Sequence, residues 1–501
     1  MDLSQKRAVP AIDLTGQRVL IVGLARQGTA LARYLAREGA SVTLTDRQPA
    51  SALAEPINEL AGLPIRFALG GHPLSLLEDT DLLCLSAGVP PDIPLVEEAR
   101  RRSIRLTNDT LLTLERSPAT VAGITGSSGK TTTTTLVGLM LEAEGLRTHV
   151  GGNIGVSLVD HLNEHEAGDW AVLELSSFQL ELFDTSPQLA GVTNITRNHL
   201  DRHRTMSAYT AAKANILRWQ TELDACVLNA DDRITGHWLR SGWVDIPVEE
   251  GSPPWSRGAR LGWSSFPIRS ARWGFSLRNE QAAGAFLKGD ELILRQPGLH
   301  EVVICRRENL RLRGMHNVAN MLAAICLATL AKTPPEAIRQ VATSFEGVEH
   351  RLEIVRRRRG ILWVNDSIAT SPERAVAAMA SFSEPVVLLA GGRDKDLVWD
   401  EFAEQAHRRA KHVLVFGEAS DLIEQVVELH EPPAGEAALW NGQPLSMVRC
   451  ADLEEAVAEA DRLAEPGDVV LLAPGGTSFD MYRDFAARGV HFRTLVNQLG
   501  E

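Results

Sequence analysis

The chain has 501 residues, 44% of them hydrophobic and 23% charged, the balance of a globular protein long enough for about three domains. Its formal net charge of −13 argues against the broad basic surface of a non-specific nucleic-acid binder, so we expect no nucleic-acid partner. No apolar stretch approaches the ~18 residues that a membrane helix needs, and the N-terminal residues lack a signal-peptide pattern. We therefore expect a cytoplasmic protein without membrane insertion.

The first segment, residues 1–118, has the pattern of a small doubly wound α/β domain. An apolar run at Val19–Val22 predicts a buried parallel strand, and Ser41–Thr45 predicts a second one. The intervening turn, GLARQG, resembles the dinucleotide fingerprint GxGxxG with Ala25 in the second glycine position. Taken alone, the pattern leaves open an NAD site, in which Asp46 would bind the ribose, or a site for another nucleotide.

The second segment, residues 119–346, begins with a strand that leads into a glycine-rich turn, a lysine and five threonines. In a phosphate loop, glycines let backbone N–H groups approach phosphate oxygens, the lysine neutralises their charge, and the next Ser or Thr binds Mg²⁺. The alternative is a Gly-Ser turn that only caps a helix. The strand before the turn favours ATP-type phosphate binding, by Gly126, Gly129, Lys130 and Thr131.

Polar side chains stand at two later strand ends of this segment. Glu174 lies within the otherwise apolar run Trp170–Ser176, and His199 and Asp201 follow the run Leu189–Ile195. At the carboxyl edge of a parallel sheet, such a carboxylate is suited to Mg²⁺, although a purely structural role stays possible. Residues 241–312 then change to alternating strands, which predicts an antiparallel β section.

The third segment, residues 347–501, again alternates apolar strands with helical stretches, which indicates a further doubly wound domain. Its expected strands are Ile361–Asp366, Pro385–Gly392, His412–Gly417 and Asp468–Gly476. The four arginines at 356–359 precede a glycine, and we expect them on a solvated hairpin edge or at an anion.

Eight motifs occur in the order found in the Mur ligase family, which the chain resembles: TGSSGKTTT, GGNIG, ELSSFQLE, NITRNHLDRH, AYTAAKANIL, NADD, GMHNVAN and EHRLE. These are ATP-dependent amide-forming enzymes of peptidoglycan precursor synthesis. The resemblance covers the second and third segments fully and the first more loosely. It implies a three-domain α/β protein with a Rossmann-like N-terminal domain (1–118), a P-loop central domain with a parallel sheet plus an antiparallel β section (119–346), and a Rossmann-like C-terminal domain (347–501).

The resemblance also implies a reaction: ATP-dependent addition of D-glutamate to UDP-N-acetylmuramoyl-L-alanine through an acyl phosphate, by a monomer with two Mg²⁺ ions. Within this class, the alternatives are an L-glutamate-adding variant, folylpolyglutamate synthase, or a ligase that adds diaminopimelate or lysine. Outside it, they are a regulatory ATP-binding protein without ligase activity and an NAD-dependent oxidoreductase.

The family motifs assign roles to residues of the second and third segments. Lys130, His199 and Lys213 are expected to be catalytic. Mg²⁺ is expected at Thr131, Glu174, His199 and Lys213. The resemblance implies that Lys213 is carbamylated, which is consistent with electrostatics because a bare lysine would repel the ion; the alternative is an ordinary ion pair of Lys213. ATP is expected to contact Gly126, Ser127, Ser128, Gly129, Lys130, Thr131, Thr132, Asn317, Asn320, Arg351 and Asp366.

The other two substrates are assigned in the same way. The UDP substrate is expected at Ala25, Arg26, Gln27, Asp46, Arg47, Ser86, Gly88, Asn153 and Ser176, with Asn108 beside them. The amino acid is expected at Thr370, Lys395, Ser478, Phe479 and Phe485. This chain departs from the family's DSKATN motif, since Ile368 replaces the lysine. Arg393 or Arg374 is a candidate to supply the missing charge, and the choice between D- and L-glutamate stays open.

Overall fold

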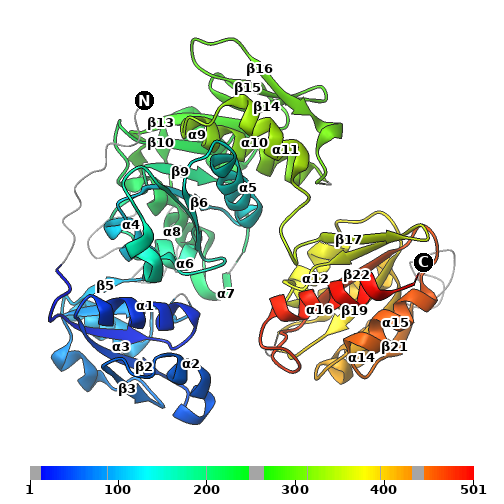
Figure 1. Ribbon diagram of the computed structural model, residues 1–501, viewed down its shortest axis with the longest axis horizontal. Helices are drawn as coiled ribbons and strands as arrows, with labels where there is room; N and C mark the ends of the chain where they lie inside the picture. The colour runs from blue at the N-terminus through cyan, green and yellow to red at the C-terminus, as the bar shows by residue number, and fades with distance from the viewer. Residues whose placement is uncertain are drawn as a thin grey trace. The chain divides into compact units, whose positions relative to one another are not determined.

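The computed structural model describes residues 13–86, 88–198, 200–246, 265–312, 314–394, 397–431 and 445–500. Chain contacts divide the protein into two compact units, Met1–Phe345 and Glu346–Glu501. Figure 1 shows the order of the elements along the chain. Two residues with predicted roles, His199 and Lys395, lie outside the described residues.

The first unit begins with a five-stranded parallel sheet of order β3-β2-β1-β4-β5. Its strands are β1 (Arg18–Val22), β2 (Ser41–Asp46), β3 (Ile65–Leu69), β4 (Leu82–Leu85) and β5 (Arg105–Thr107). Helices α1 (Arg26–Arg37) and α4 (Asp109–Arg116) pack on one face, and α3 (Pro94–Arg101) packs on the other; the short helix α2 is Ala54–Glu59. The strand order reverses between β1 and β4, so the loops after these strands open a crevice at the carboxyl edge.

The larger sheet of this unit has nine strands in the order β16-β15-β14-β13-β10-β9-β6-β8-β7. The strands that pair in parallel are β6 (Thr120–Thr125), β7 (Thr148–Gly152), β8 (Trp170–Glu174), β9 (Leu189–Val192), β10 (Ala225–Asn229), β13 (Ala271–Ser276) and, against β13, β14 (Gly284–Lys288). Strands β15 (Glu291–Arg295) and β16 (Val302–Arg306) complete an antiparallel edge with β14.

The helices of this larger sheet are α5 (Lys130–Ala143), α6 (Ser177–Leu180), α7 (Leu200–His203), α8 (Met206–Arg218), α9 (Arg233–Ser241), α10 (Met315–Leu330) and α11 (Pro335–Ser344). A separate two-stranded sheet joins β11 (Trp243–Val244) to β12 (Phe266–Pro267). The predicted antiparallel section is confirmed from β14 onward, but β13 extends the parallel part because it pairs in parallel with β10.

The second unit has one six-stranded sheet of order β17-β18-β22-β19-β20-β21. Its strands are β17 (Glu353–Arg358), β18 (Ile361–Asn365), β19 (Val386–Gly391), β20 (Ala410–Phe416), β21 (Ser446–Arg449) and β22 (Val469–Gly475). Helices α12 (Pro372–Met379), α13 (Asp400–Arg409) and α14 (Ser420–Leu429) share one core, and α15 (Leu453–Leu463) and α16 (Phe485–Gln498) share the other. Successive side chains of a strand enter opposite cores, as Trp363 and Val364 do, so the central strands are apolar on both faces.

The predicted fold class is confirmed, and one expectation for the arginine run is wrong. The run lies in the edge hairpin β17–β18, as predicted, but it is not simply solvated. Arg358 is buried and forms an ion pair with Asp461, while Arg356 donates hydrogen bonds to the carbonyls of Val496 and Leu499 at the end of α16. The run therefore joins the hairpin to two helices.

Two further findings bear on the chemistry of the chain. All five cysteines are free and buried, and burial raises the pKa of each thiol, so their thiols are poor nucleophiles. Across the described ranges, no helix has the length and apolar character to cross a bilayer.

Candidate active site

The loop between β6 and α5 approaches its neighbours so closely that side chains would not fit. Gly129 has a φ of +79°, and a Cβ there would lie 2.1 Å from Asn320 Oδ1 on α10. Gly126 has a φ of +154°, and its Cβ would lie 1.8 Å from Thr193 Oγ1. The two glycines are therefore required by geometry, and they allow the tight backbone turn directly before α5 that a phosphate loop needs.

Residues that follow β9 hold this loop in place. The Ser128 N–H donates to Asn194 Oδ1 at 3.0 Å, and the Ser127 N–H donates to the Asn194 carbonyl at 2.9 Å. Thr193 Oγ1 donates to the Ser128 carbonyl at 2.6 Å, and the Ser127 hydroxyl lies 2.9 Å from the Tyr209 hydroxyl. The loop is thus ordered by the protein itself before any ligand binds.

A buried carboxylate stands beside the start of α5. Glu174, which ends β8, is 2% exposed. Its Oε2 accepts a hydrogen bond of 2.7 Å from Thr131 Oγ1, and its Oε1 accepts one of 2.9 Å from Asn153 Nδ2. A carboxylate and a hydroxyl side by side are the oxygen ligands that Mg²⁺ prefers, so these residues fit the ion that the sequence predicts.

Two lysines converge on the phosphate loop. Lys130 Nζ donates to the Gly126 carbonyl at 2.9 Å, and Lys213 Nζ donates to the same carbonyl at 2.8 Å. Lys213 is 1% exposed, and burial, together with the charge of Lys130, lowers the pKa of its ammonium well below the ordinary value, against the opposing effect of Glu174. Its surroundings therefore shift the Lys213 side chain toward the neutral amine, relative to an exposed lysine.

The threonines after Lys130 differ in what their side chains do. Thr131 contacts Glu174, whereas Thr133 and Thr134 are fully buried, and within the described ranges their hydroxyls have no hydrogen-bond partner. These two side chains therefore pack in the interior of the unit. Of the other predicted ATP residues, Asn317 and Asn320 lie on α10, where Asn320 Nδ2 donates to Asn317 Oδ1 at 3.3 Å.

The predicted UDP residues of the first sheet gather at its carboxyl edge. Helix α1 begins at Arg26, directly after Ala25, and Asp46 ends β2. The Asp46 carboxylate accepts hydrogen bonds from the N–H groups of Leu24 at 2.8 Å and Gln48 at 2.9 Å, so it orders the loop itself. Ser86, Arg47 and Gly88 come from loops of the same edge: Ser86 is buried and donates to the Gly23 carbonyl at 2.9 Å, and Arg47 and Gly88 are exposed.

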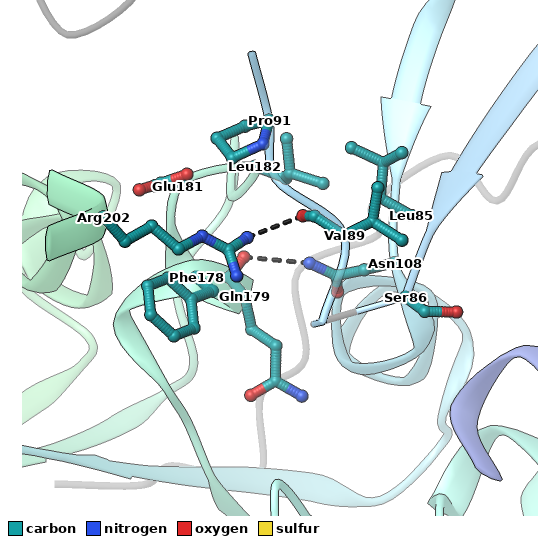
Figure 2. A pocket seen from close by; sticks show the side chains of 10 residues that line it. All are labelled: Leu85, Ser86, Val89, Pro91, Asn108, Phe178, Gln179, Glu181, Leu182 and Arg202. Atoms are coloured by element: carbon teal, nitrogen blue, oxygen red, sulfur yellow. Dashed lines mark hydrogen bonds between the residues drawn. The ribbon is translucent and has the colours of Figure 1, made fainter. Parts of the chain in front are cut away.

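A small pocket lies between this sheet and helix α6 (Figure 2). Arg202 Nη2 donates to the Val89 carbonyl at 2.6 Å, and its guanidinium lies 3.8 Å from the centre of the Phe178 ring. Asn108 caps α4 through its Oδ1 and donates from Nδ2 to the Gln179 carbonyl at 2.9 Å. The other lining residues are Leu85, Ser86, Pro91, Glu181 and Leu182.

Sequence reasoning did not single out Phe178 or Arg202, although both lie within quoted motifs, ELSSFQLE and NHLDRH. The sequence feature that indicates these residues is an aromatic side chain and a cationic one in two motifs that follow successive strands of one predicted sheet. Ser176 was assigned to the substrate, and here its hydroxyl joins a capping box with Gln179, the residue three positions later, at the start of α6. Asn153, by contrast, reaches the predicted metal residue Glu174.

In the second unit, the described amino-acid residues and Asp366 stand at or after the carboxyl ends of β18 and β22. Asp366 follows β18, and Thr370 lies four residues later; Ser478 and Phe479 follow β22, and Phe485 begins α16. Ser478 is 2% exposed, whereas Phe479 is 60% exposed. The sheet therefore places Thr370, Ser478, Phe479 and Phe485 on one side of this unit.

Asp366 is buried, and its Oδ1 accepts a hydrogen bond of 2.9 Å from the Leu352 N–H. Burial raises the pKa of this carboxyl to about 6, although the Leu352 N–H and the charges of Arg351 and Arg374 act in the opposite direction. Arg374 Nη1 donates to the Ile368 carbonyl at 3.2 Å, whereas Arg393 forms an ion pair of 2.7 Å with Glu418. Of the two candidates for the missing lysine, Arg374 is the one in contact with residue 368.

A phosphate loop at the edge of a mainly parallel sheet, with a buried carboxylate beside the first helical turn, defines a P-loop nucleotide-binding protein. Three family models match the chain: a MurD-like Mur ligase N-terminal domain at residues 17–108, the Mur ligase middle domain at 124–243 and the Mur ligase glutamate ligase domain at 350–476. With curated relatives at up to 40% identity over nearly the whole length, the chain belongs to the Mur ligase family.

Several of these relatives carry one name, UDP-N-acetylmuramoylalanine–D-glutamate ligase. The protein from Symbiobacterium thermophilum is 40% identical over 96% of this chain and 98% of its own length. That from Roseiflexus is 37% identical over 97% and 99%, and that from Acetivibrio thermocellus is 36% identical over 97% of each chain.

Solved structures share the fold at lower identity. The UDP-N-acetylmuramate-alanine ligase MurC from Thermotoga maritima matches with a TM-score of 0.53 and 20% identity, covering 96% of this chain and 99% of that one. A murein peptide ligase from Psychrobacter arcticus matches with a TM-score of 0.51 and 15% identity, covering 97% of this chain and 100% of that one.

Proposed function

We propose that this chain is an ATP-dependent ligase that joins D-glutamate to UDP-N-acetylmuramoyl-L-alanine in peptidoglycan precursor synthesis. The relatives that carry this name match it over nearly their whole length. One structural observation carries the proposal: Lys130, Lys213 and the Thr131–Glu174 pair all converge on one phosphate loop. This convergence of two cations and an oxygen-ligand pair supports phosphoryl transfer at the loop.

The reaction has two steps in this proposal. A carboxylate oxygen of the alanyl group attacks the γ-phosphorus of ATP, the bond to the bridging oxygen breaks, and ADP leaves. The amine of glutamate then attacks the acyl carbon, a C–N bond forms, and phosphate leaves with the oxygen that the carboxylate contributed; the amine loses a proton. No covalent intermediate with the protein is required.

The residues of the first unit have separate roles in the first step. Backbone amides of Gly129 and Lys130 at the start of α5 hold the phosphates, and the Lys130 ammonium offsets the charge that develops on the transferred group. Thr131 and Glu174 would hold Mg²⁺, which would supply positive charge that offsets the repulsion between the two anionic substrates. Asn153 links Glu174 to the substrate side of the site.

We further propose a second Mg²⁺, for which His199 and Lys213 would supply ligands. Lys213 would first react as the neutral amine with CO₂, forming a carbamate and releasing a proton. Its burial at the phosphate loop supports this step, because only an uncharged amine is nucleophilic. His199 keeps its predicted role as a proposal, since it lies outside the described residues.

The remaining substrate sites are proposals of the same kind. UDP would bind at Ala25, Arg26, Gln27, Asp46, Arg47, Ser86, Gly88, Asn153 and Ser176, and ATP would also contact Ser127, Ser128, Thr132, Asn317, Asn320, Arg351 and Asp366. Glutamate would bind at Thr370, Lys395, Ser478, Phe479 and Phe485. We also propose domains at 1–118, 119–346 and 347–501, a monomeric state and a cytoplasmic location. The confinement of each large sheet to one of these ranges supports the division.

An ADP-release assay tests the function. The purified chain is given ATP, Mg²⁺ and UDP-N-acetylmuramoyl-L-alanine, with D-glutamate, L-glutamate, diaminopimelate or lysine in parallel reactions. We expect ADP and product to form together with D-glutamate and in no other arm. Preference for L-glutamate would overturn the substrate assignment, and ADP release that ignores the amine would point to a nucleotide-binding protein without ligase activity.

A further inference from the structure

One buried cation in the second unit has no role in the function proposed above. Arg488, in the first turn of α16, is 0% exposed. Burial of a guanidinium is costly, and it lowers the pKa of Arg488 to about 10, although the charges of Asp480 and Tyr482 oppose this. Within the described ranges its Nη1 has no hydrogen-bond partner. The burial of this guanidinium therefore indicates that its hydrogen bonds have a structural or functional role.

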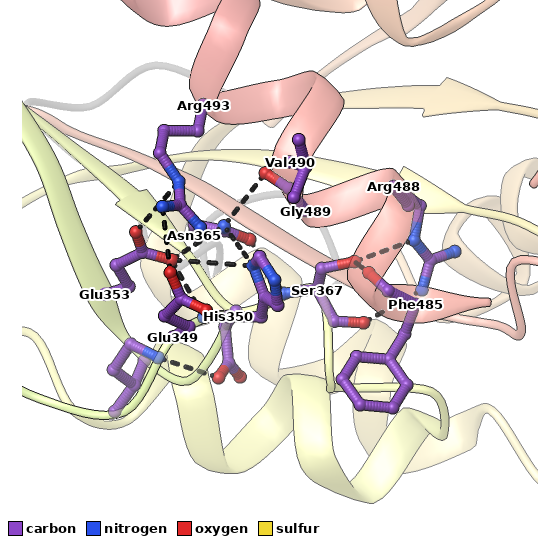
Figure 3. Close-up of polar contacts among 12 residues, drawn as sticks. Glu349, His350, Glu353, Asn365, Ser367, Phe485, Arg488, Gly489, Val490 and Arg493 are labelled. Atoms are coloured by element: carbon purple, nitrogen blue, oxygen red, sulfur yellow. Dashed lines mark hydrogen bonds and ion pairs between the residues drawn. The ribbon is translucent and has the colours of Figure 1, made fainter. Parts of the chain in front are cut away.

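The other nitrogens of Arg488 bind backbone and hydroxyl oxygens from two loops, and Figure 3 shows the contacts with Ser367. Nε donates to Ser367 Oγ at 3.0 Å, and Nη2 donates to the Ser367 carbonyl at 3.0 Å and the Gly476 carbonyl at 3.2 Å. The Ser367 hydroxyl in turn donates to the Phe485 carbonyl at 2.8 Å. One planar group thus joins the loop after β18, the loop after β22 and the start of α16.

A third loop meets the same guanidinium. Gly392 follows β19 and has a φ of +95°, and a Cβ there would lie 2.9 Å from Arg488 Nη1. Its chain neighbour Arg393 exchanges backbone hydrogen bonds of 2.8 Å with Thr477. Arg488 therefore lies where the chain leaves the carboxyl ends of three adjacent strands.

These loops carry the residues assigned to the amino acid. Ser367 precedes Thr370 by three positions, and Gly476 precedes Ser478 by two. Phe485, whose carbonyl is bound through Ser367, is another member of the predicted set. The guanidinium of an arginine has five N–H donors in a fixed plane and can bind several carbonyls at once. The ammonium of a lysine has its three donors on a single atom.

We propose that Arg488 is a positioning residue for the amino-acid substrate: its guanidinium holds the segments 367–370 and 476–479 in the arrangement that binds glutamate. This inference rests on the proposed function. It assigns a task to Arg488 that acts through the loops and not through contact with the reacting atoms.

The test compares one substitution at two buried arginines of the same sheet. Arg488→Lys removes the guanidinium at the carboxyl edge of the sheet. Arg358→Lys removes a guanidinium at the amino edge, where Arg358 pairs with Asp461 beside the start of β18. Ser367→Ala removes only the hydroxyl between Arg488 and Phe485. For each variant of the full chain, kcat, the KM of D-glutamate, ATP and the UDP substrate, and the unfolding temperature are measured.

Loss of one or two such hydrogen bonds corresponds to roughly a tenfold change in affinity. Arg488→Lys is expected to raise the KM of D-glutamate about 10-fold, with the KM of ATP and of the UDP substrate within about 3-fold of wild type. Ser367→Ala is expected to shift the same KM by less. Arg358→Lys is expected to lower the unfolding temperature without a change in the KM of D-glutamate.

An unchanged KM for D-glutamate in a folded Arg488→Lys chain would overturn the inference, as would an equal rise of all three KM values or the same rise in Arg358→Lys. If Arg488→Lys does not fold, Ser367→Ala takes its place: a rise in the KM of D-glutamate alone supports the inference, and an unchanged KM of D-glutamate overturns it. A wild-type chain that forms no product would instead refute the proposed function, so the two failures are distinguishable.

Discussion

The Thr131 hydroxyl donates a hydrogen bond of 2.7 Å to the Glu174 carboxylate, which joins the first turn of α5 to the end of β8. Both groups are buried, so neither exchanges this contact readily for water. The pair brings together the two kinds of oxygen that Mg²⁺ prefers, beside a loop built for phosphate. It is the structural basis for placing phosphoryl transfer at this point of the sheet.

Replacing Glu174 by glutamine tests this pair. The substitution preserves shape and removes the charge, so we expect kcat to fall on the order of 10²-fold and the Mg²⁺ concentration for half-maximal rate to rise. Steady-state rates at graded Mg²⁺ measure both effects. The matched control is Glu222→Gln, at an exposed glutamate, which should leave both values unchanged. An unaltered Mg²⁺ dependence in Glu174→Gln would argue against a metal ligand.

Gly129→Ala should abolish ATP binding, because its Cβ would be 2.1 Å from Asn320 Oδ1 at a φ of +79°. The control is Gly145→Ala, which has a similar φ of +83° but nothing within 4 Å. It should cost only about 1 kcal/mol of backbone strain and bind ATP normally. Calorimetric titration with ATP measures the affinity of both variants. Equal affinities would contradict the phosphate-binding role given to the loop between β6 and α5.

Lys213 should form a carbamate. Burial lowers the pKa of its ammonium, which favours the neutral amine that reacts with CO₂, and the amount of neutral amine rises as pH rises. In ¹³C-bicarbonate, we expect a carbamate resonance in the wild-type chain that is absent from Lys213→Arg, together with loss of activity in that variant. An active wild-type chain without the resonance would show that Lys213 works unmodified.

Asp366 should make the stability of the chain depend on pH. Its folded pKa of about 6 exceeds the unfolded value of about 3.9, so between these values the folded state binds the proton that the unfolded state has lost. Stability should therefore fall as pH rises from about 4 to about 6, by about 3 kcal/mol relative to Asp366→Asn, and then level off. Urea unfolding of both chains at several pH values measures the difference, and parallel profiles would contradict the shift.

Much of the fold followed from local pattern. Buried apolar runs predict strands because both faces of a parallel strand are covered, as at Pro385–Gly392, which forms β19 over Val386–Gly391. The phosphate loop was also predictable from local sequence, because the tight turn before the lysine requires residues without a side chain. Strands β14 and β15, joined at Gly289 and Asp290, likewise form part of the antiparallel section expected in residues 241–312.

Contacts between distant parts of the chain were not predictable in this way. Nothing in the sequence near Gly129 indicates that Asn320 touches it. Arg488 and Arg358 look like ordinary surface arginines, and only tertiary packing buries them. Sequence pattern reports which side chains are apolar, and it does not report which polar ones the fold encloses.

Oxygen-18 transfer tests the acyl-phosphate route most directly. UDP-N-acetylmuramoyl-L-alanine labelled with ¹⁸O in the alanyl carboxylate is converted with ATP and D-glutamate, and the phosphate is examined by ³¹P NMR. If the carboxylate attacks the γ-phosphorus, each phosphate released with product carries one labelled oxygen. Unlabelled phosphate alongside amide product would contradict phosphoryl transfer to the carboxylate, and with it the role given to the loop at Lys130.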